Sequence, residues 1–310
     1  MMRLADIRAL ADTVGDDRRS PVADTVAARW GVPPGMARFR RSSASHVFTV
    51  PEGFLRFVPA DRPPFAAEHL SALRDRGLSV VRPIPALSGA LVEAVPTVLG
   101  DMRAMVVSVA PGAQIDVDEV TPDRAAAWGA ALATLHRDGD TGTPLPGPFA
   151  ELSDAATVFA DDPAFVAATE RIARRLDELP CDAAVFGAVH GDFELDNLAW
   201  VGNTATAFDF DEAARSWFLA DVASAVRDLD GNPMLDDFVA GYRTIRPLPD
   251  LAHLPLFTAA QAACFAVRVR RALGTAGPDE PAWATALRDR LANHIARYQT
   301  SVVNGYHPIQ

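Results

Sequence analysis

The sequence predicts an α+β fold with two lobes, a small N-terminal lobe built on an antiparallel sheet and a larger, mainly helical C-terminal lobe. Short strand-like runs separated by turn-forming residues dominate the first third of the chain, whereas apolar residues at helical spacing dominate the rest. The exception in the second part is a hairpin at residues 198–208. We therefore expect an N-terminal lobe of residues 1–107, with helices in residues 1–31, and a C-terminal lobe of residues 108–310.

The N-terminal lobe is predicted from helix and turn signals. Two packing helices precede an antiparallel meander, and a third helix follows it and ends before Gly77. Two further hairpins are expected to turn at Ser88-Gly89 and Gly100-Asp101, and the second leads into an apolar strand. The expected helices are residues 3–14, 21–30 and 63–76, and the expected strands are residues 36–41, 47–50, 54–58 and 104–109.

The C-terminal lobe is predicted from caps and apolar spacing. Thr121 is a favourable N-cap, Pro122 suits the first helical position, and the helix that they begin is expected to end at His136. A connector rich in proline and glycine spans residues 141–148. The expected helices are residues 122–136, 151–160, 163–179, 218–229, 233–244, 256–273 and 281–300.

Composition narrows the class of protein. The chain has 310 residues, 49% of them hydrophobic and 22% charged, and a net charge of −11, which argues against a general nucleic-acid binder. The two cysteines, Cys181 and Cys264, give no disulfide framework. No apolar run approaches the ~18 residues of a membrane span, and the N-terminus lacks a signal-peptide core. We expect a cytoplasmic protein without a membrane or nucleic-acid partner; the sequence does not indicate its oligomeric state.

A pair of polar side chains is predicted at the open end of the hairpin. Gly202-Asn203 favours a two-residue turn, and counting outward from it places Asn197 opposite Phe208. Asn197 and Asp209 should therefore emerge side by side, where strand hydrogen bonding has stopped. Because Mg²⁺ is usually held by few protein oxygens plus phosphate and water, this pair is a candidate metal site.

Two further loops add candidate functional groups. Asp192 lies five residues before Asn197, so it supplies a carboxylate near the cation and is a candidate base. The small-residue loop between the first two strands could lay backbone N–H groups, at Ser43 and Ser45, against a phosphate. His190 is expected to hydrogen-bond the loop backbone rather than to bind a metal.

These residues resemble the catalytic segments of the aminoglycoside phosphotransferase and choline kinase superfamily, which has the protein-kinase-like fold. The resemblance rests on His190-Gly191-Asp192, on Asn197 five residues after that Asp, and on Asp209-Phe210-Asp211. Gly191 stands where protein kinases carry Arg, and Asp211 where they carry Gly. The role of Asp211 stays open between a second metal ligand and a solvated carboxylate.

The resemblance extends from about Ala37 onward and implies further roles. Arg56 corresponds to the basic residue that contacts the nucleotide phosphates, and Glu68 to the helix acid that pairs with it. Backbone groups near Ser108 and Ala110 correspond to the hinge that binds adenine. The helix ending at His136 is expected to pack under the catalytic loop, which Asp221 is expected to brace.

The implied activity is transfer of the γ-phosphoryl group of ATP or GTP to a hydroxyl of a small molecule, with Mg²⁺. Three alternatives remain from the residues alone: a metal-dependent hydrolase, a nucleotide-binding pseudo-enzyme, and a protein Ser/Thr kinase. The sequence does not identify the acceptor. Six acidic residues could form a rim for an amine-bearing acceptor, although solvated surface carboxylates are the favoured interpretation. They are Asp161, Asp162, Glu194, Asp196, Asp236 and Asp237.

Overall fold

The computed structural model describes residues 1–229, 231–248, 250–276 and 280–305, and the chain divides into two compact units. The first unit contains Met1–Asp75, Val80–Val109 and Ala272–Ala286. The second contains Arg76–Ser79, Ala110–Arg271 and the chain from Leu287 onward. The expected division at residue 107 did not include the return of Ala272–Ala286 to the first unit.

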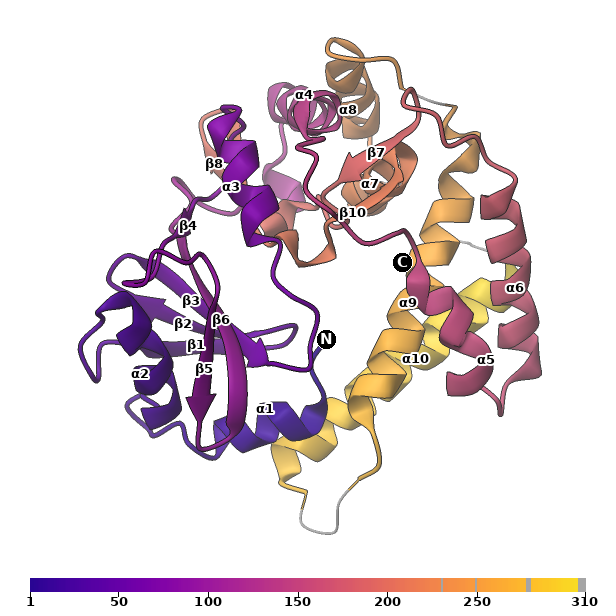
Figure 1. Cartoon of the computed structure of the whole chain (residues 1–310). Coiled ribbons are helices and arrows are strands. Elements are labelled where there is room, and N and C mark those ends of the chain that lie inside the picture. The colour runs from indigo at the N-terminus through magenta and orange to yellow at the C-terminus, as the bar shows by residue number, and fades with distance from the viewer. Residues whose placement is uncertain (230, 249, 277–279, 306–310) are drawn as a thin grey trace. The chain divides into compact units, whose positions relative to one another are not determined.

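The first unit is built on an antiparallel sheet (Figure 1). In the described residues its strands run in the order β1-β2-β3-β6-β4, and β5 also pairs with β6. The rings of Phe48 and Phe57 stack at 5.7 Å in a core that α2 helps to cover. The strands are β1 Arg38–Ser42, β2 His46–Val50, β3 Gly53–Pro59, β4 Pro83–Ile84, β5 Glu93–Thr97 and β6 Gly100–Ser108; the helices are α1 Leu4–Ala11, α2 Pro21–Ala27, η1 Ala28–Trp30 and α3 Ala67–Asp75.

Three sequence predictions for this unit are wrong in detail. Ser88-Gly89 lies in a turn but not in a hairpin, because β4 and β5 pair with separate parts of β6 rather than with each other. The next hairpin turns two residues early, since Thr97 already pairs with Gly100. Helix α3 begins at Ala67 instead of residue 63, because prolines at positions 63 and 64 disfavour a helical conformation in the residues before them.

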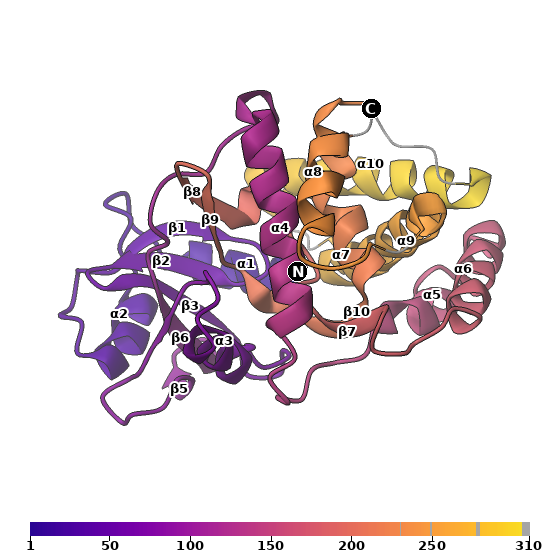
Figure 2. The ribbon, with the colours of Figure 1, turned by 90° about the horizontal axis from the view of Figure 1, so that it is seen from above.

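The second unit is mainly helical. Helices α4 and α8 lie side by side in both views (Figures 1 and 2), and small residues allow the close approach. A Cβ on Gly129 of α4 would lie 1.9 Å from the Phe238 carbonyl oxygen, and one on Gly241 of α8 would lie 1.9 Å from that of Ala126. Among the described helices none is long and apolar enough to cross a membrane.

The elements after the first unit follow in chain order. Helix α10 begins in the first unit and continues into the second. The bounds are η2 Val117–Glu119, α4 Pro122–Asp138, η3 Ala150–Asp154, α5 Ala155–Val158, α6 Pro163–Asp177, β7 Phe186–Val189, η4 Leu195–Asn197, β8 Leu198–Val201, β9 Thr204–Ala207, η5 Phe210–Glu212, β10 Ala214–Trp217, α7 Phe218–Ala225, η6 Arg227–Leu229, α8 Met234–Arg243, η7 Leu251–His253, α9 Leu254–Leu273 and α10 Ala282–Asn304.

The strand pair β7 and β10 was not predicted from the sequence. Each strand has four residues, which is too short for a clear alternating pattern. Val189, the last residue of β7, pairs with Ala214 of β10, and His190 follows immediately. The pair therefore anchors both ends of the segment that carries the candidate functional residues.

Candidate active site

The hairpin forms in the predicted register. Val201 pairs with Thr204 in β8 and β9, and the N–H of Phe208 donates to the carbonyl of Asn197 at 3.0 Å. Asn197 and Asp209 therefore leave the open end of the hairpin together. Asp209 has the left-handed conformation, with φ of +66°, and begins the turn into η5.

Asp192 and Asn197 are directly hydrogen-bonded. The Nδ2 amide of Asn197 donates to the Asp192 carboxylate oxygen Oδ2 at 3.0 Å and to the Asp192 backbone carbonyl at 2.9 Å. Both amide hydrogens are used on Asp192, so the amide oxygen of Asn197 is the group left to bind a cation. The structure thus brings the candidate base and one candidate metal ligand together.

His190 holds the loop backbone, as the sequence analysis predicted. Its Nδ1 accepts the N–H of Asp192 at 3.2 Å, and its Nε2 lies 3.0 Å from the Phe208 carbonyl oxygen. Because a carbonyl only accepts, this arrangement assigns the proton to Nε2 and makes the ring neutral. His190 therefore joins the loop of the candidate base to the hairpin, and both of its ring nitrogens already have partners.

Asp221 holds the loop of residues 190 and 191 through backbone hydrogen bonds, as expected from the family resemblance. Its carboxylate is fully buried on α7 and accepts the N–H groups of His190 and Gly191 at 2.7 and 2.6 Å. His136 of α4 contacts the same carboxylate at 3.1 Å and the Tyr242 hydroxyl at 2.8 Å. Burial lowers the pKa of His136, although its contact with Asp221 opposes this effect. His136 is therefore a neutral structural group at pH 7.

Position 191 requires glycine because the backbone of Glu212 lies very close to it. Its φ is +86°, and a Cβ at this position would lie 2.1 Å from the carbonyl oxygen of Glu212. No side chain fits, which explains why this chain lacks the Arg that protein kinases carry. The contact packs the catalytic loop against η5, and an ion pair between Glu212 and Arg268 ties that turn to α9.

The donor set suits a hard divalent cation. The described residues contain no group of three or more His, Cys, Asp or Glu side chains that could hold a metal. An Asn–Asp pair alone leaves most coordination positions to phosphate oxygens and water, which is the usual situation for Mg²⁺. Asn197 and Asp209 are therefore compatible with a metal that arrives with a nucleotide.

In the first unit, Arg56 is held by a hydroxyl rather than by the expected carboxylate. Its Nε and Nη2 atoms both donate to Ser45 Oγ at 3.2 Å, and its guanidinium lies 5.7 Å from the ring centre of Phe65. Glu68 is exposed in the first turn of α3, and its side chain makes no hydrogen bond or ion pair within the described ranges. The expected Arg56–Glu68 pair is therefore not formed in this structure.

The other nucleotide-side residues occupy two chain segments. The N–H of Ser43 donates to the Ser45 carbonyl at 3.1 Å, so this group already has a partner. At the end of β6, the N–H of Ser108 donates to the Arg82 carbonyl and its hydroxyl accepts the N–H of Arg82. Ala110 begins the second unit and has no backbone hydrogen bond to any described residue.

Ser224 was not predicted from the sequence. Its hydroxyl donates to Asp192 Oδ1 at 3.2 Å from α7, three residues after Asp221. Residues three apart share one helix face, so the spacing from the expected brace at Asp221 is a signal that could have found it.

Three of the six acidic residues of the predicted rim are already neutralised or used structurally. Asp161 pairs with Arg270 at 2.6 Å, and Glu194 pairs with Arg227. Asp162 caps α6 by accepting the N–H of Phe165. These contacts support the favoured interpretation of surface carboxylates over a cation-binding rim.

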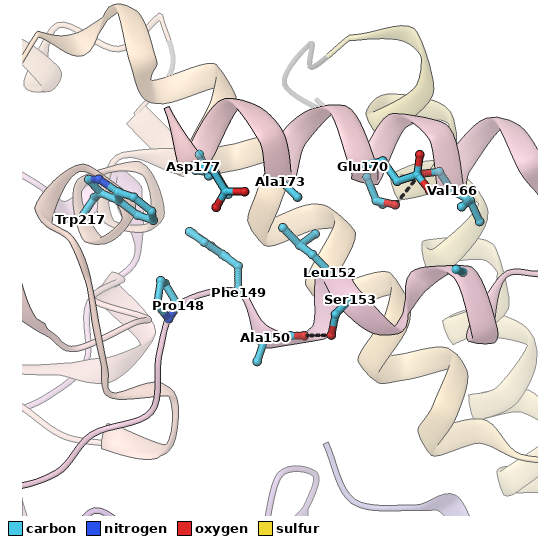
Figure 3. Close-up of a pocket in the computed structure, with 13 residues that line it drawn as sticks. Pro148, Phe149, Ala150, Leu152, Ser153, Val166, Glu170, Ala173, Asp177 and Trp217 are labelled. Atoms are coloured by element: carbon cyan, nitrogen blue, oxygen red, sulfur yellow. Dashed lines mark hydrogen bonds between the residues drawn. The ribbon is translucent and has the colours of Figure 1, made fainter. Parts of the chain in front are cut away.

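A cavity of about 460 Å³ lies beside α6 in the second unit (Figure 3). Its walls are mainly apolar and include Phe149, Leu152 and Trp217. Phe149 has a φ of +52°, which is rare for a bulky residue. The carboxylates of Glu170 and Asp177 also line it, and both residues are exposed.

Comparison with known proteins assigns the chain to one family. Residues 37–257 match the model of the family described as "Phosphotransferase enzyme family". An uncharacterized protein of Deinococcus radiodurans is 33% identical over 220 residues, and amicoumacin kinase of Bacillus subtilis is 25% identical over 222 residues. The two alignments cover 63% and 64% of this chain and the same shares of the relatives, so the chain spans less than two thirds of the length of these curated relatives.

Solved structures show the fold. Amicoumacin kinase hAmiN, in complex with AMP-PNP, Ca²⁺ and Ami, gives a TM-score of 0.74 at 20% identity and 95% coverage of both chains. A microcompartment-associated aminopropanol kinase gives 0.62 at 22% identity, covering 91% of this chain and 97% of the other. A choline/ethanolamine kinase family protein from Mesorhizobium loti gives 0.61 at 14% identity, covering 92% and 100%. The predicted kinase-like α+β fold is therefore confirmed.

Proposed function

Because the chain belongs to the phosphotransferase enzyme family, we propose that it transfers the γ-phosphoryl group of ATP to a hydroxyl group of a small molecule. One observation carries this proposal. The hydrogen bonds from Asn197 fix Asp192, and they leave the Asn197 amide oxygen as the group that can bind a metal ion. A general base and a metal site joined in this way serve phosphoryl transfer.

Asp192 is the proposed base. It orients the acceptor hydroxyl and takes its proton as the oxygen forms a bond to the γ-phosphorus. The bond between that phosphorus and the bridging β–γ oxygen breaks, and its electrons leave with ADP. Because both Asp192 oxygens are already held, by Ser224 and Asn197, the carboxylate is oriented before the substrate arrives.

The remaining proposed roles concern the nucleotide. Asn197 and Asp209 would hold Mg²⁺, which when bound neutralises phosphate charge. Arg56, positioned by Ser45, would bind phosphate oxygens, a task that suits a planar guanidinium. Glu68 would assist Arg56 once nucleotide is bound.

Backbone groups would complete the nucleotide site. The loop containing Ser43 and Ser45 would lie along the phosphates, and the chain around Ser108 and Ala110 would bind the base. The unbonded backbone N–H of Ala110, within the described part of the chain, supports this role. ATP is the proposed donor, with GTP as the comparison to be measured.

The proposed acceptor is a small-molecule alcohol. The similar proteins named above include an amicoumacin kinase, an aminopropanol kinase and a choline/ethanolamine kinase family protein, so small alcohols that carry an amine are the first compounds to screen. A protein acceptor is not favoured by any of these relatives.

The test is a coupled ADP-release assay with Mg-ATP and a panel of amino alcohols, sugars and amine-bearing antibiotics. The wild-type chain should release ADP only with an acceptor, and Asp192→Ala should lower turnover by about two to four orders of magnitude. ATP binding, measured by calorimetry, should stay nearly unchanged in the variant. Full activity of Asp192→Ala would refute the assignment of the base.

A further inference from the structure

We propose that Ser224 is a positioning residue for Asp192, and that its hydroxyl sets the rotation of the Asp192 carboxylate. The inference rests on the proposed function, in which Asp192 is the base. Ser224 is 3% exposed, and its Oγ lies 3.2 Å from Asp192 Oδ1. Since Asn197 donates to Oδ2, the two donors together fix both carboxylate oxygens.

The direction of the Ser224 hydroxyl follows from its surroundings. A helical serine commonly donates to the carbonyl four residues earlier, which here is that of Ala220. In α7 that carbonyl accepts the helical N–H of Ser224 itself, and Gln261 Nε2 of α9 donates to it at 2.8 Å. Both lone pairs of the carbonyl are then used, so the Ser224 hydroxyl donates to Asp192 instead.

One face of α7 thereby performs two separate tasks. Asp221 holds the backbone of the catalytic loop through the N–H groups of His190 and Gly191. Ser224, three residues later, holds only the side chain of Asp192. Removing the Ser224 hydroxyl should therefore change the base and leave the loop backbone in place.

Ser224→Ala should lower kcat by about tenfold, because a hydrogen bond to a charged group is lost from the reacting carboxylate. The KM for ATP should stay within about twofold, since no nucleotide contact is altered. The acid limb of the pH–rate profile should move to higher pH, because a donor to the charged form favours that form. A purely structural role would not produce this pH shift.

Two rescue variants separate loss of the hydroxyl from a packing effect. Ser224→Thr keeps the hydroxyl and should restore kcat and the pH profile. If its extra methyl group lowers the Tm in this buried position, Ser224→Cys, a weaker donor of similar size, should give a kcat between those of Ser224→Ala and the wild type.

Thr134→Val is the matched control. Thr134 is a helical residue of the same unit whose hydroxyl donates to the Ala130 carbonyl within its own helix at 2.8 Å. Its replacement removes a helix hydroxyl without touching the catalytic loop, so kcat and the pH profile should match those of the wild type.

The outcomes are distinguishable. If Asp192→Ala is inactive while Ser224→Ala keeps the wild-type kcat and pH profile, the positioning role is wrong and the proposed function stands. A fall in kcat with lower Tm, no pH shift and no rescue by either variant would also overturn it. Absence of ADP release by the wild type with every acceptor would overturn both the proposed function and this role.

Discussion

The loop of the proposed base and the serine loop of the first unit are held in different ways. Residues 190–192 are hydrogen-bonded to distant parts of the chain: they donate to Asp221 and to the Phe208 carbonyl, and Asp192 accepts from Ser224. The serine loop is held by a bond between Ser43 and Ser45, by the donation from Arg56 to Ser45, and by the N–H of Met2, which donates to the Ser43 carbonyl at 2.9 Å. The carboxylate of the proposed base is therefore oriented directly by Ser224 and Asn197, whereas the serine loop is held by the N-terminus, its own backbone and Arg56.

Gly191→Ala should have the largest effect, because it adds a Cβ 2.1 Å from the Glu212 carbonyl oxygen. The loop must shift, and a misplacement of this kind lowers kcat by about 100-fold or more. The matched control is Gly202→Ala, which has a φ of +61° but no atom within 4 Å of the added Cβ. Steady-state assays of both variants separate steric displacement from backbone strain. Equal, small losses would show that the close approach is not needed.

Acid should destabilise the first unit through His46. Burial lowers the pKa of His46 to about 4 from an ordinary value of 6.5. Between these pH values the unfolded chain binds a proton that the folded chain does not, so the free energy of unfolding falls as the pH drops. The loss should reach about 3 kcal/mol at pH 4, on the basis of 1.36 kcal/mol per pKa unit.

Urea unfolding of the wild type and His46→Gln between pH 7 and pH 4.5 measures this effect. The variant should lose part of the pH dependence and keep the part that comes from the buried His136. Parallel curves for the two chains would exclude His46 as a source of acid sensitivity.

Ser45→Ala should act on nucleotide affinity more than on turnover. It removes the acceptor of two bonds from Arg56, which is 8% exposed, and such a loss is worth about 1–3 kcal/mol. We expect a KM for ATP raised by about threefold to tenfold, with kcat changed less. Ser43→Ala, in the same loop, removes an exposed side chain and keeps the backbone. It should bind ATP like the wild type; equal effects of both variants would contradict the role of Ser45.

Glu68→Gln should have the smallest effect, because the exposed Glu68 does not pair with Arg56 in this structure. Kinetic constants within about twofold of the wild type are expected. A KM for ATP raised by tenfold would show instead that the proposed pair of Glu68 and Arg56 in the nucleotide-bound state contributes more than an exposed ion pair does.

The parts of the fold and site that could be predicted are those set by local geometry. The Gly202-Asn203 turn determines the strand register, and the register determines that Asn197 lies beside Phe208. Asp221 was expected from the family resemblance and occupies the expected position. The two-part architecture followed from the change between strand-like and helical patterns.

The missed features depend on tertiary contacts. Ser224 meets Asp192 across a separation of 32 residues, and its spacing of three residues from Asp221 is the one sequence signal that points to this partner. The direction in which the Glu68 side chain points depends on where α3 begins, and helix ends are the least certain part of a prediction from sequence. Strands β7 and β10 acquire their structure by pairing with each other, so their short sequences alone do not reveal them.

The two cysteines give the unaltered chain a natural labelling position. Cys264 is 3% exposed in α9, and burial raises the pKa of its thiol, so it reacts slowly at neutral pH. Cys181 is exposed and follows Pro180, whose carbonyl accepts the indole N–H of Trp217 at 2.8 Å. Trp217 lines the cavity shown in Figure 3. A thiol-reactive fluorophore would therefore attach, without mutagenesis, next to the residue that hydrogen-bonds Trp217, and a change in its emission on adding a compound would test whether this cavity takes small molecules.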